Sequence, residues 1–139
     1  MRYIQLRSPS GRRIKFRLCT RKASITCLAF IKALPLSARA VHARFAGEEV
    51  YIPAGPVLRV PYENATLRPK RGELGYAPTC ARSSVARSIA FVYGKAQFSE
   101  RVNIFAQVVR ADRSKLEKLG REIWLKGSRI FRLEALDPT

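Results

Sequence analysis

The sequence predicts a mainly β fold, a closed β-barrel whose ends are capped by two helices. Many short runs of β-branched and aromatic residues are separated by Gly, Pro and Asn, as in antiparallel all-β folds. Only two segments have the apolar spacing of an amphipathic helix. Because closing a sheet removes the edges that would pair with other chains, we expect so many strands to form a barrel.

The N-terminal strands show the clearest alternation. Tyr3–Arg7 and Arg12–Cys19 flank the turn residues Ser8–Gly11, which predicts an antiparallel hairpin. From Arg13 to Leu18 cations alternate with apolar residues, so one face of this strand is buried and the other is positive. Further strands are expected at Val41–Phe45, Glu49–Ile52, Val57–Val60, Leu74–Ala77, Ser88–Tyr93, Val102–Val109 and Ile130–Leu136.

Two helices interrupt the strands. The first is predicted over Ser24–Leu34 and ends before Pro35, which cannot continue a helix. The second runs from Ser114 to about residue 125, with Ser114 and Glu117 in the spacing of a capping box and Gly127 as its stop. We expect one domain over residues 1–139.

Composition excludes several classes of protein. No apolar run reaches the ~20 residues of a membrane span, and the N-terminus lacks a secretory signal, so a cytoplasmic protein is expected. Three cysteines without a CxxC pair, together with the single His42, predict no structural zinc site and no cofactor. Cys19, Cys27 and Cys80 are interpreted as free thiols; a disulfide from Cys19 is the alternative in a heat-adapted chain.

Charge is the strongest compositional signal. The chain has 27 Lys and Arg against 10 Asp and Glu, a formal net charge of +17. Such an excess attracts anions, and Arg matches carboxylate and phosphate geometry. The alternative is a solubilising surface without a dedicated partner. The predicted anion or nucleic-acid surface consists of Arg12, Arg13, Lys15, Arg68, Lys70, Arg71, Arg82 and Arg87.

The order of elements and several strings resemble the cyclophilin-like superfamily, especially its small bacterial and archaeal members of unknown function. The strings similar to cyclophilins are Ala23–Phe30, Gly75–Pro78, Ile89–Gly94 and Asn103–Val109. Those similar to the small uncharacterised proteins are His42–Tyr51, Glu63–Thr66 and Gly72–Tyr76. The resemblance covers nearly the whole chain and implies a helix-capped barrel with a groove on one wall.

The resemblance does not imply prolyl isomerase activity. Val41–Phe45 roughly matches the cyclophilin F-H-R strand, so Arg44 is the one residue that carries over. The supporting glutamine and the M-A-N-A and N-T-N-G-S-Q-F-F blocks are absent. Trp124 is on the late helix, and a bound proline would have few walls to pack against.

A polar cluster around His42 is the candidate site. His42 and Arg44 are two residues apart on an expected strand, and Glu49 and Tyr51 have the same spacing on the next. With Glu48, Glu49 or Glu63, His42 is the only proton-transfer set in the sequence. The alternative is a structural histidine with Arg44 paired to Glu48 or Glu49. The catalytic candidates are His42, Arg44, Glu49 and Glu63, and the ligand-binding candidates are Arg44, Tyr51, Asn64, Tyr76 and Tyr93.

Three functional hypotheses follow. The first is a small anionic ligand bound near His42 and Arg44, with or without catalysis. The second is sequence-independent nucleic-acid binding, because the cations are not interleaved with the aromatic residues that stack bases. The third is peptide or protein recognition in the groove. Glu63–Thr66 can also be an ordered turn without function. No membrane partner is expected, and oligomeric state is left open.

Overall fold

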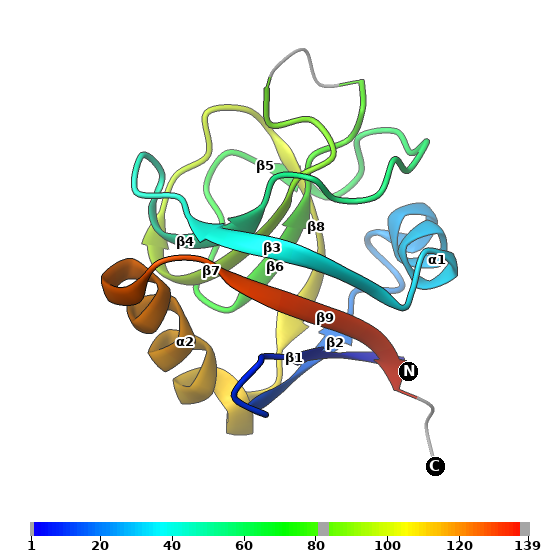
Figure 1. Ribbon diagram of the computed structural model, residues 1–139. Helices are drawn as coiled ribbons and strands as arrows, with labels where there is room; N and C mark the ends of the chain where they lie inside the picture. Colours follow the sequence, from blue (N-terminus) through cyan, green and yellow to red (C-terminus); the bar gives the residue numbers. More distant parts are fainter. Residues whose placement is uncertain (1, 81–83, 137–139) are drawn as a thin grey trace.

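A computed structural model describes residues 2–80 and 84–136 of the protein (Figure 1). Its elements are β1 (Tyr3–Arg7), β2 (Arg13–Leu18), α1 (Ser24–Lys32), β3 (Leu36–His42), β4 (Gly47–Ile52), β5 (Ala65–Thr66), β6 (Glu73–Tyr76), β7 (Ile89–Ala96), β8 (Val102–Val108), a 3₁₀ turn (Arg110–Asp112), α2 (Arg113–Lys126) and β9 (Arg129–Leu136). In the described ranges, neither helix has the length and apolarity needed to cross a membrane.

The strands close into an eight-stranded antiparallel barrel. Their order is β2-β1-β9-β3-β4-β7-β6-β8, and pairing of β2 with β8 completes the ring. The short β5 pairs only with β8 and adds to the outside of the barrel. The mainly β closed barrel with two helices is therefore confirmed.

The β1–β2 hairpin follows from the alternation in its sequence. Ile4 pairs with Phe16 and Leu6 with Ile14, so the apolar side chains of both strands point into the barrel. The Arg and Lys residues between them lie on the outer face. This predicted hairpin is confirmed.

Aromatic side chains fill the barrel. The ring of Phe91 lies 6.2 Å from that of Phe16 and 5.4 Å from that of Phe131, both at steep angles. From α1, Phe30 packs 4.5 Å from Phe105. Three buried residues of α2, Leu116, Leu119 and Ile123, join the same core. The two helices lie on opposite sides of the barrel (Figure 1).

Several sequence-based boundaries were wrong. Val57–Val60 is not a strand; Leu58 N–H donates to the hydroxyl of Tyr76 (2.8 Å), which itself donates to the Pro56 carbonyl (2.7 Å). The Tyr76 hydroxyl thus satisfies backbone groups of this segment that in a strand would be paired with a neighbouring strand. The strand expected at Val41–Phe45 is instead β3, which ends at His42. A turn follows.

The predicted capping box of α2 was also wrong. The helix begins at Arg113, and no side chain caps its N-terminus. The Asp112 carboxylate accepts a hydrogen bond from Lys15 N–H (2.8 Å) and lies 3.2 Å from the Lys115 ammonium. The carboxylate at the N-cap position therefore bonds to β2 and to Lys115 instead of to the helix backbone. Gly127 ends the helix at φ 93°, as predicted.

The three cysteines are free thiols. Cys27 is buried on α1, where its Sγ donates to the Phe105 carbonyl at 3.2 Å. Burial, with smaller contributions from Cys19 and Glu63, raises the pKa of Cys27 to about 12. This thiol is a core group and not a nucleophile.

We expect Phe91→Ala to lower the free energy of unfolding by about 3–5 kcal/mol, because it leaves a cavity between Phe16 and Phe131. Urea unfolding followed by circular dichroism measures the change. Leu125→Ala is the control, since that side chain is 80% exposed and its loss should change the free energy little. A loss below about 1 kcal/mol for Phe91→Ala would contradict this packing.

Candidate functional site

The barrel wall separates the residues of the predicted polar cluster. His42 pairs with Val50, and Val50 packs in the core, so His42 points to the inner side at the end of the barrel. Glu49 is adjacent to Val50 and therefore points outward, as does Tyr51. The structure thus brings His42 and Arg44 together near α2 and places Glu49 and Tyr51 on another face.

His42 lies among aromatic residues at the barrel end. Its Nε2 is 2.6 Å from the hydroxyl of Tyr93, and its ring lies edge-on to Trp124 with centroids 4.5 Å apart. Burial, reinforced by Arg44, lowers the pKa of His42, while Glu48 opposes the shift. Burial and Glu48 raise the pKa of Tyr93. At neutral pH the contact therefore joins a neutral imidazole to a neutral phenol.

Arg44 holds the C-terminal end of α2. Its guanidinium lies 4.4 Å from the ring of Trp124 and donates to the Trp124 carbonyl at 2.7 Å. A carbonyl in the last turn of a helix has no intrahelical partner, and a cation is favourable there. Arg44 therefore positions Trp124 against His42.

A groove runs between α2 and the strands β4 and β7; we call it the α2 groove. One part, about 550 Å³, is lined by residues of both sides, including Glu48, Lys95 and Arg121. An adjoining part of about 360 Å³ extends along Trp124. Tyr93, Glu48 and Arg121 line both parts. This volume is in the range of small-molecule sites.

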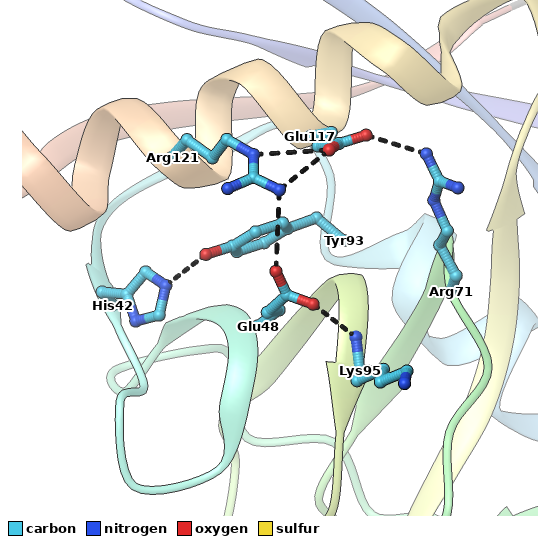
Figure 2. Close-up of polar contacts among 7 residues, drawn as sticks. All are labelled: His42, Glu48, Arg71, Tyr93, Lys95, Glu117 and Arg121. Atoms are coloured by element: carbon cyan, nitrogen blue, oxygen red, sulfur yellow. Dashed lines mark hydrogen bonds and ion pairs between the residues drawn. The ribbon is translucent and has the colours of Figure 1, made fainter.

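A polar network crosses the α2 groove (Figure 2). Arg121 lies 3.1 Å from Glu117 and 3.8 Å from Glu48, and Arg71 reaches Glu117 at 2.8 Å. Glu48 also accepts from the backbone N–H of Lys95 at 2.9 Å. The network ties α2 to the barrel wall through side chains that are partly exposed.

Two glycines make room for this network. A Cβ at Gly120 would lie 2.2 Å from the Tyr93 ring, and a Cβ at Gly94 would lie 2.3 Å from a carboxylate oxygen of Glu48. Only a residue without a side chain lets α2 approach Tyr93 this closely.

The α2 groove carries more positive than negative groups. Lys70, Arg71, Lys95 and Arg121 line its larger part, against Glu48 and Glu117. The carboxylates are already engaged by Arg71 and Arg121. Across residues 2–80 and 84–136, the ammonium groups of Lys70 and Lys95 have no acceptor. These two cations are available to an anion.

Glu49 lies in a separate cavity on the outer wall. The residue is 5% exposed, and its Oε1 has no hydrogen-bond partner among the residues that the structure describes. Burial raises the pKa of Glu49 to about 8. Tyr51 and Phe45, whose rings meet edge-on at 5.8 Å, line the same cavity.

The other predicted site residues have structural contacts. Glu63 accepts from Thr26 N–H at 2.5 Å and so caps α1, whose N-cap residue is an alanine. Asn64 has φ 49° and donates to the Ile104 carbonyl at 2.9 Å. Tyr76 is fully buried. The structure brings none of these three to His42. The turn expected over Glu63–Thr66 is only a bend at Asn64, because Ala65–Thr66 forms β5 against β8.

The predicted anion surface is divided. On the two sides of α2, Arg12 pairs with Glu122 (3.3 Å) and Arg71 with Glu117. Lys15 lies over the Tyr3 ring at 4.1 Å. At the other end of β7, Arg87 donates to the Gly55 carbonyl at 2.7 Å. Arg13, Arg68 and Lys70 are exposed, and Arg82 lies outside the described residues.

Sequence reasoning missed most residues of the α2 groove. The spacing of Glu117 and Arg121, four residues apart on a helix, was the one local signal of an ion pair. A glycine at position 120, inside a helical segment, was a second sign of a close contact. Nothing in the sequence linked Trp124 to His42 or Lys95 to Glu48.

Comparison with known proteins identifies a family. A family model described as a protein of unknown function, DUF3830, matches residues 8–135. The chain belongs to the DUF3830 family. No curated protein sequence matches it.

Solved structures show the same fold as this DUF3830 member. The structure of McbB in complex with tryptophan is 17% identical, with a TM-score of 0.74 over 98% of this chain. This chain spans 45% of McbB. The hypothetical protein AF2241 from Archaeoglobus fulgidus is 19% identical, with a TM-score of 0.62 over 96% of this chain and 93% of its own. At these identities the likeness shows the fold alone.

Gly120→Ala should destabilise the protein by about 1–3 kcal/mol, because the added methyl group overlaps the Tyr93 ring. Helix propensity alone predicts the opposite sign, a gain of about 0.5–1 kcal/mol. Urea unfolding decides between them. In a Tyr93→Ala background the same substitution should become neutral or stabilising; a similar loss in both backgrounds would disprove the contact.

Glu49 should make stability depend on pH. The folded protein keeps the Glu49 proton up to about pH 8, whereas the unfolded chain loses it near pH 4.5, so the free energy of unfolding falls as pH rises between these values. Glu49→Gln removes this contribution. The stability of Glu49→Gln relative to wild type should therefore increase from pH 5 to pH 8.

The free energy of unfolding of Glu49→Gln, relative to wild type, can rise by at most about 1.4 kcal/mol per pH unit. Among the described residues, Glu100 and Tyr51 are the other titratable groups that line the cavity, and they are present in both wild type and Glu49→Gln. Urea unfolding at several pH values measures the difference, with Glu122→Gln as the matched control. A difference that stays constant with pH would contradict a protonated Glu49.

Proposed function

We propose that this chain is a cyclophilin-like binding domain that holds a small anionic ligand in the α2 groove and lacks typical prolyl isomerase activity. The observation that carries the proposal is that the ammonium groups of Lys70 and Lys95 have no partner among the described residues, on a groove whose carboxylates are already engaged. An anion there would gain charge-assisted hydrogen bonds in a partly enclosed space.

Arg121 adds a third donor. Its guanidinium is 3.8 Å from Glu48, longer than a charge-assisted hydrogen bond, while its contact with Glu117 is 3.1 Å. A ligand carboxylate or phosphate can therefore replace the weak Glu48 contact without breaking the stronger one. Trp124 and Tyr93 supply apolar surface for the rest of the ligand.

The proposal changes the part assigned to Arg44. The sequence-based hypothesis made Arg44 the anion anchor, but its guanidinium is engaged by the ring and carbonyl of Trp124. We assign the anchor to Lys70, Lys95 and Arg121, and we assign to Arg44 the positioning of Trp124. Tyr93 lines the groove, and His42 contacts its hydroxyl at 2.6 Å; these are the groups that would transfer a proton if the ligand reacts.

Cyclophilin-like membership is supported by the closed barrel with two helices and by the sequence strings that resemble that superfamily. The absence of prolyl isomerase activity is inferred from the missing glutamine and the missing strand blocks. McbB was solved in complex with tryptophan. That complex belongs to McbB, and it is a reason to include amino acids among the ligands tested here.

A second candidate function is sequence-independent nucleic-acid binding. The net charge of +17 and the exposed Arg13, Arg68 and Lys70 favour it. It differs from the first in its salt dependence, because contact with about six phosphates weakens binding by ~10³-fold between low and moderate salt.

Calorimetric titration with inorganic phosphate, a dicarboxylate and amino acids tests the first proposal. For any ligand that binds, Lys95→Gln and Lys70→Gln should each weaken affinity by about tenfold or more, since each removes one charge-assisted hydrogen bond. Lys32→Gln, an exposed lysine on α1, is the matched control and should leave affinity unchanged. Trp124, the only tryptophan, provides a fluorescence signal for phosphate and the dicarboxylate.

Two results would contradict this function. If both lysine variants bind like wild type, the ligand lies elsewhere. If only DNA or RNA oligonucleotides bind, with the steep salt dependence above, the nucleic-acid function replaces it.

A further inference from the structure

The outer-wall cavity at Glu49 differs from the rest of this cationic molecule. Eleven of the described residues line it, among them Phe45, Glu49, Tyr51, Phe98, Ser99 and Glu100. Two of them are carboxylates, and no Lys, Arg or His lines the cavity within the described residues. In a chain with 27 cations and 10 anions, this is a local reversal of charge.

One side-chain oxygen of Glu49 receives no hydrogen bond from the described residues. Its Oε1 is buried, the residue is only 5% exposed, and no group in residues 2–80 and 84–136 donates to that oxygen. A buried polar atom without a hydrogen bond costs about 1–3 kcal/mol. The barrel wall fixes this position, since Glu49 pairs with Val92 on β7 between the inward-facing Phe91 and Tyr93.

We infer that the Glu49 cavity is a binding site for a primary ammonium head group. This inference goes beyond the anion site of the α2 groove and involves a different face, ligand charge and set of residues.

Size selects the head group. The cavity has about 30 Å³ for the centres of water-sized groups, enough for one or two of them. A primary ammonium is of that size, whereas a trimethylammonium group is several times larger. The remainder of the ligand must extend past Phe45, which is 71% exposed at the mouth.

The lining matches the donors and charge of an ammonium group. Its three N–H donors can meet Glu49, Glu100 and the Ser99 hydroxyl. Phe45, Tyr51 and Phe98 place aromatic rings around it, and aromatic faces attract cations. A neutral alcohol would gain no ion pair, and an anion would find no cation among the described lining residues.

Binding requires Glu49 to lose its proton. At pH 7 the carboxyl is protonated, because burial raises its pKa to about 8. The reaction is then Glu49–COOH plus R–NH₃⁺ giving the ion pair Glu49–COO⁻ with R–NH₃⁺ and one proton in solution. Affinity should therefore rise by about tenfold per pH unit below pH 8 and level off above it. It should fall again only when the amine itself deprotonates, near ~10.4 for a lysine-like amine.

NMR titration of the full chain tests the inference. The probes are n-butylamine, as a free amine, and Nα-acetyl-lysine methylamide, as a lysine side chain. The backbone signals of Ala46 and Ser99 should shift, and affinity should follow the pH dependence above. Binding of either probe supports the site, and their relative affinities show whether free amines or lysine side chains are preferred. Butanol and tetramethylammonium should not shift these signals.

Matched variants separate the site from general charge. Glu49→Gln should weaken the amine affinity by at least tenfold and abolish its rise with pH. Glu100→Gln, at the partly exposed mouth, should weaken it several-fold without affecting folding. Glu122→Gln removes a carboxylate on α2 and should leave amine binding unchanged.

Three results would overturn the inference. The first is that neither amine shifts the signals. The second is that the amine binds wild type and Glu49→Gln equally. The third is that Na⁺, K⁺ or Ca²⁺ displaces the amine and that this ion binding also depends on Glu49. The last would identify a metal site, for which the described residues offer no group of three His, Cys, Asp or Glu. Because Lys70 and Lys95 take no part, failure here leaves the α2 groove proposal intact.

Discussion

Closure of the barrel by pairing of β2 with β8 is the constraint on which the rest of the structure depends. Phe16 pairs with Val108 and Leu18 with Ala106, which joins the N-terminal hairpin to the last strand before α2. Closure creates an inside that only large side chains can fill, and Phe16, Phe91 and Phe131 fill it. It also leaves two open ends, which α1 and α2 cover by adding their apolar faces to the same core.

The way α2 covers its end determines the α2 groove. Tyr93 continues the inward-facing series of β7 to the rim of the barrel, and Gly120 lets the helix approach its ring. The same approach brings Arg121 and Glu117 over Glu48 and Arg71, and brings Trp124 beside His42. A helix docked by apolar packing thus carries a polar network on its exposed side, where water and ligands have access (Figure 2).

Net charge alone describes this protein poorly. Several cations of the predicted anion surface are engaged, since Arg12 and Arg71 pair with glutamates of α2 and Arg87 bonds to a carbonyl. Glu49 in the outer-wall cavity directly follows Glu48 in the α2 groove, because successive residues of a strand face opposite sides of the wall. The wall therefore separates a groove lined by several cations from a cavity whose described lining includes two glutamates and no cation.

The sequence by itself determined the fold class, the β1–β2 hairpin, both helices and most strands, because these follow from local alternation, helical spacing and Gly or Pro at the ends. It indicated His42 and Glu49 but could not decide that they face opposite ways. That depends on the register of His42 against Val50, a contact between separate strands. Likewise the contact of His42 with Trp124, 82 positions later in the chain, exists only because barrel closure and the Gly120 contact dock α2 beside β3. Local patterns specify elements, whereas long-range packing decides which side chains meet.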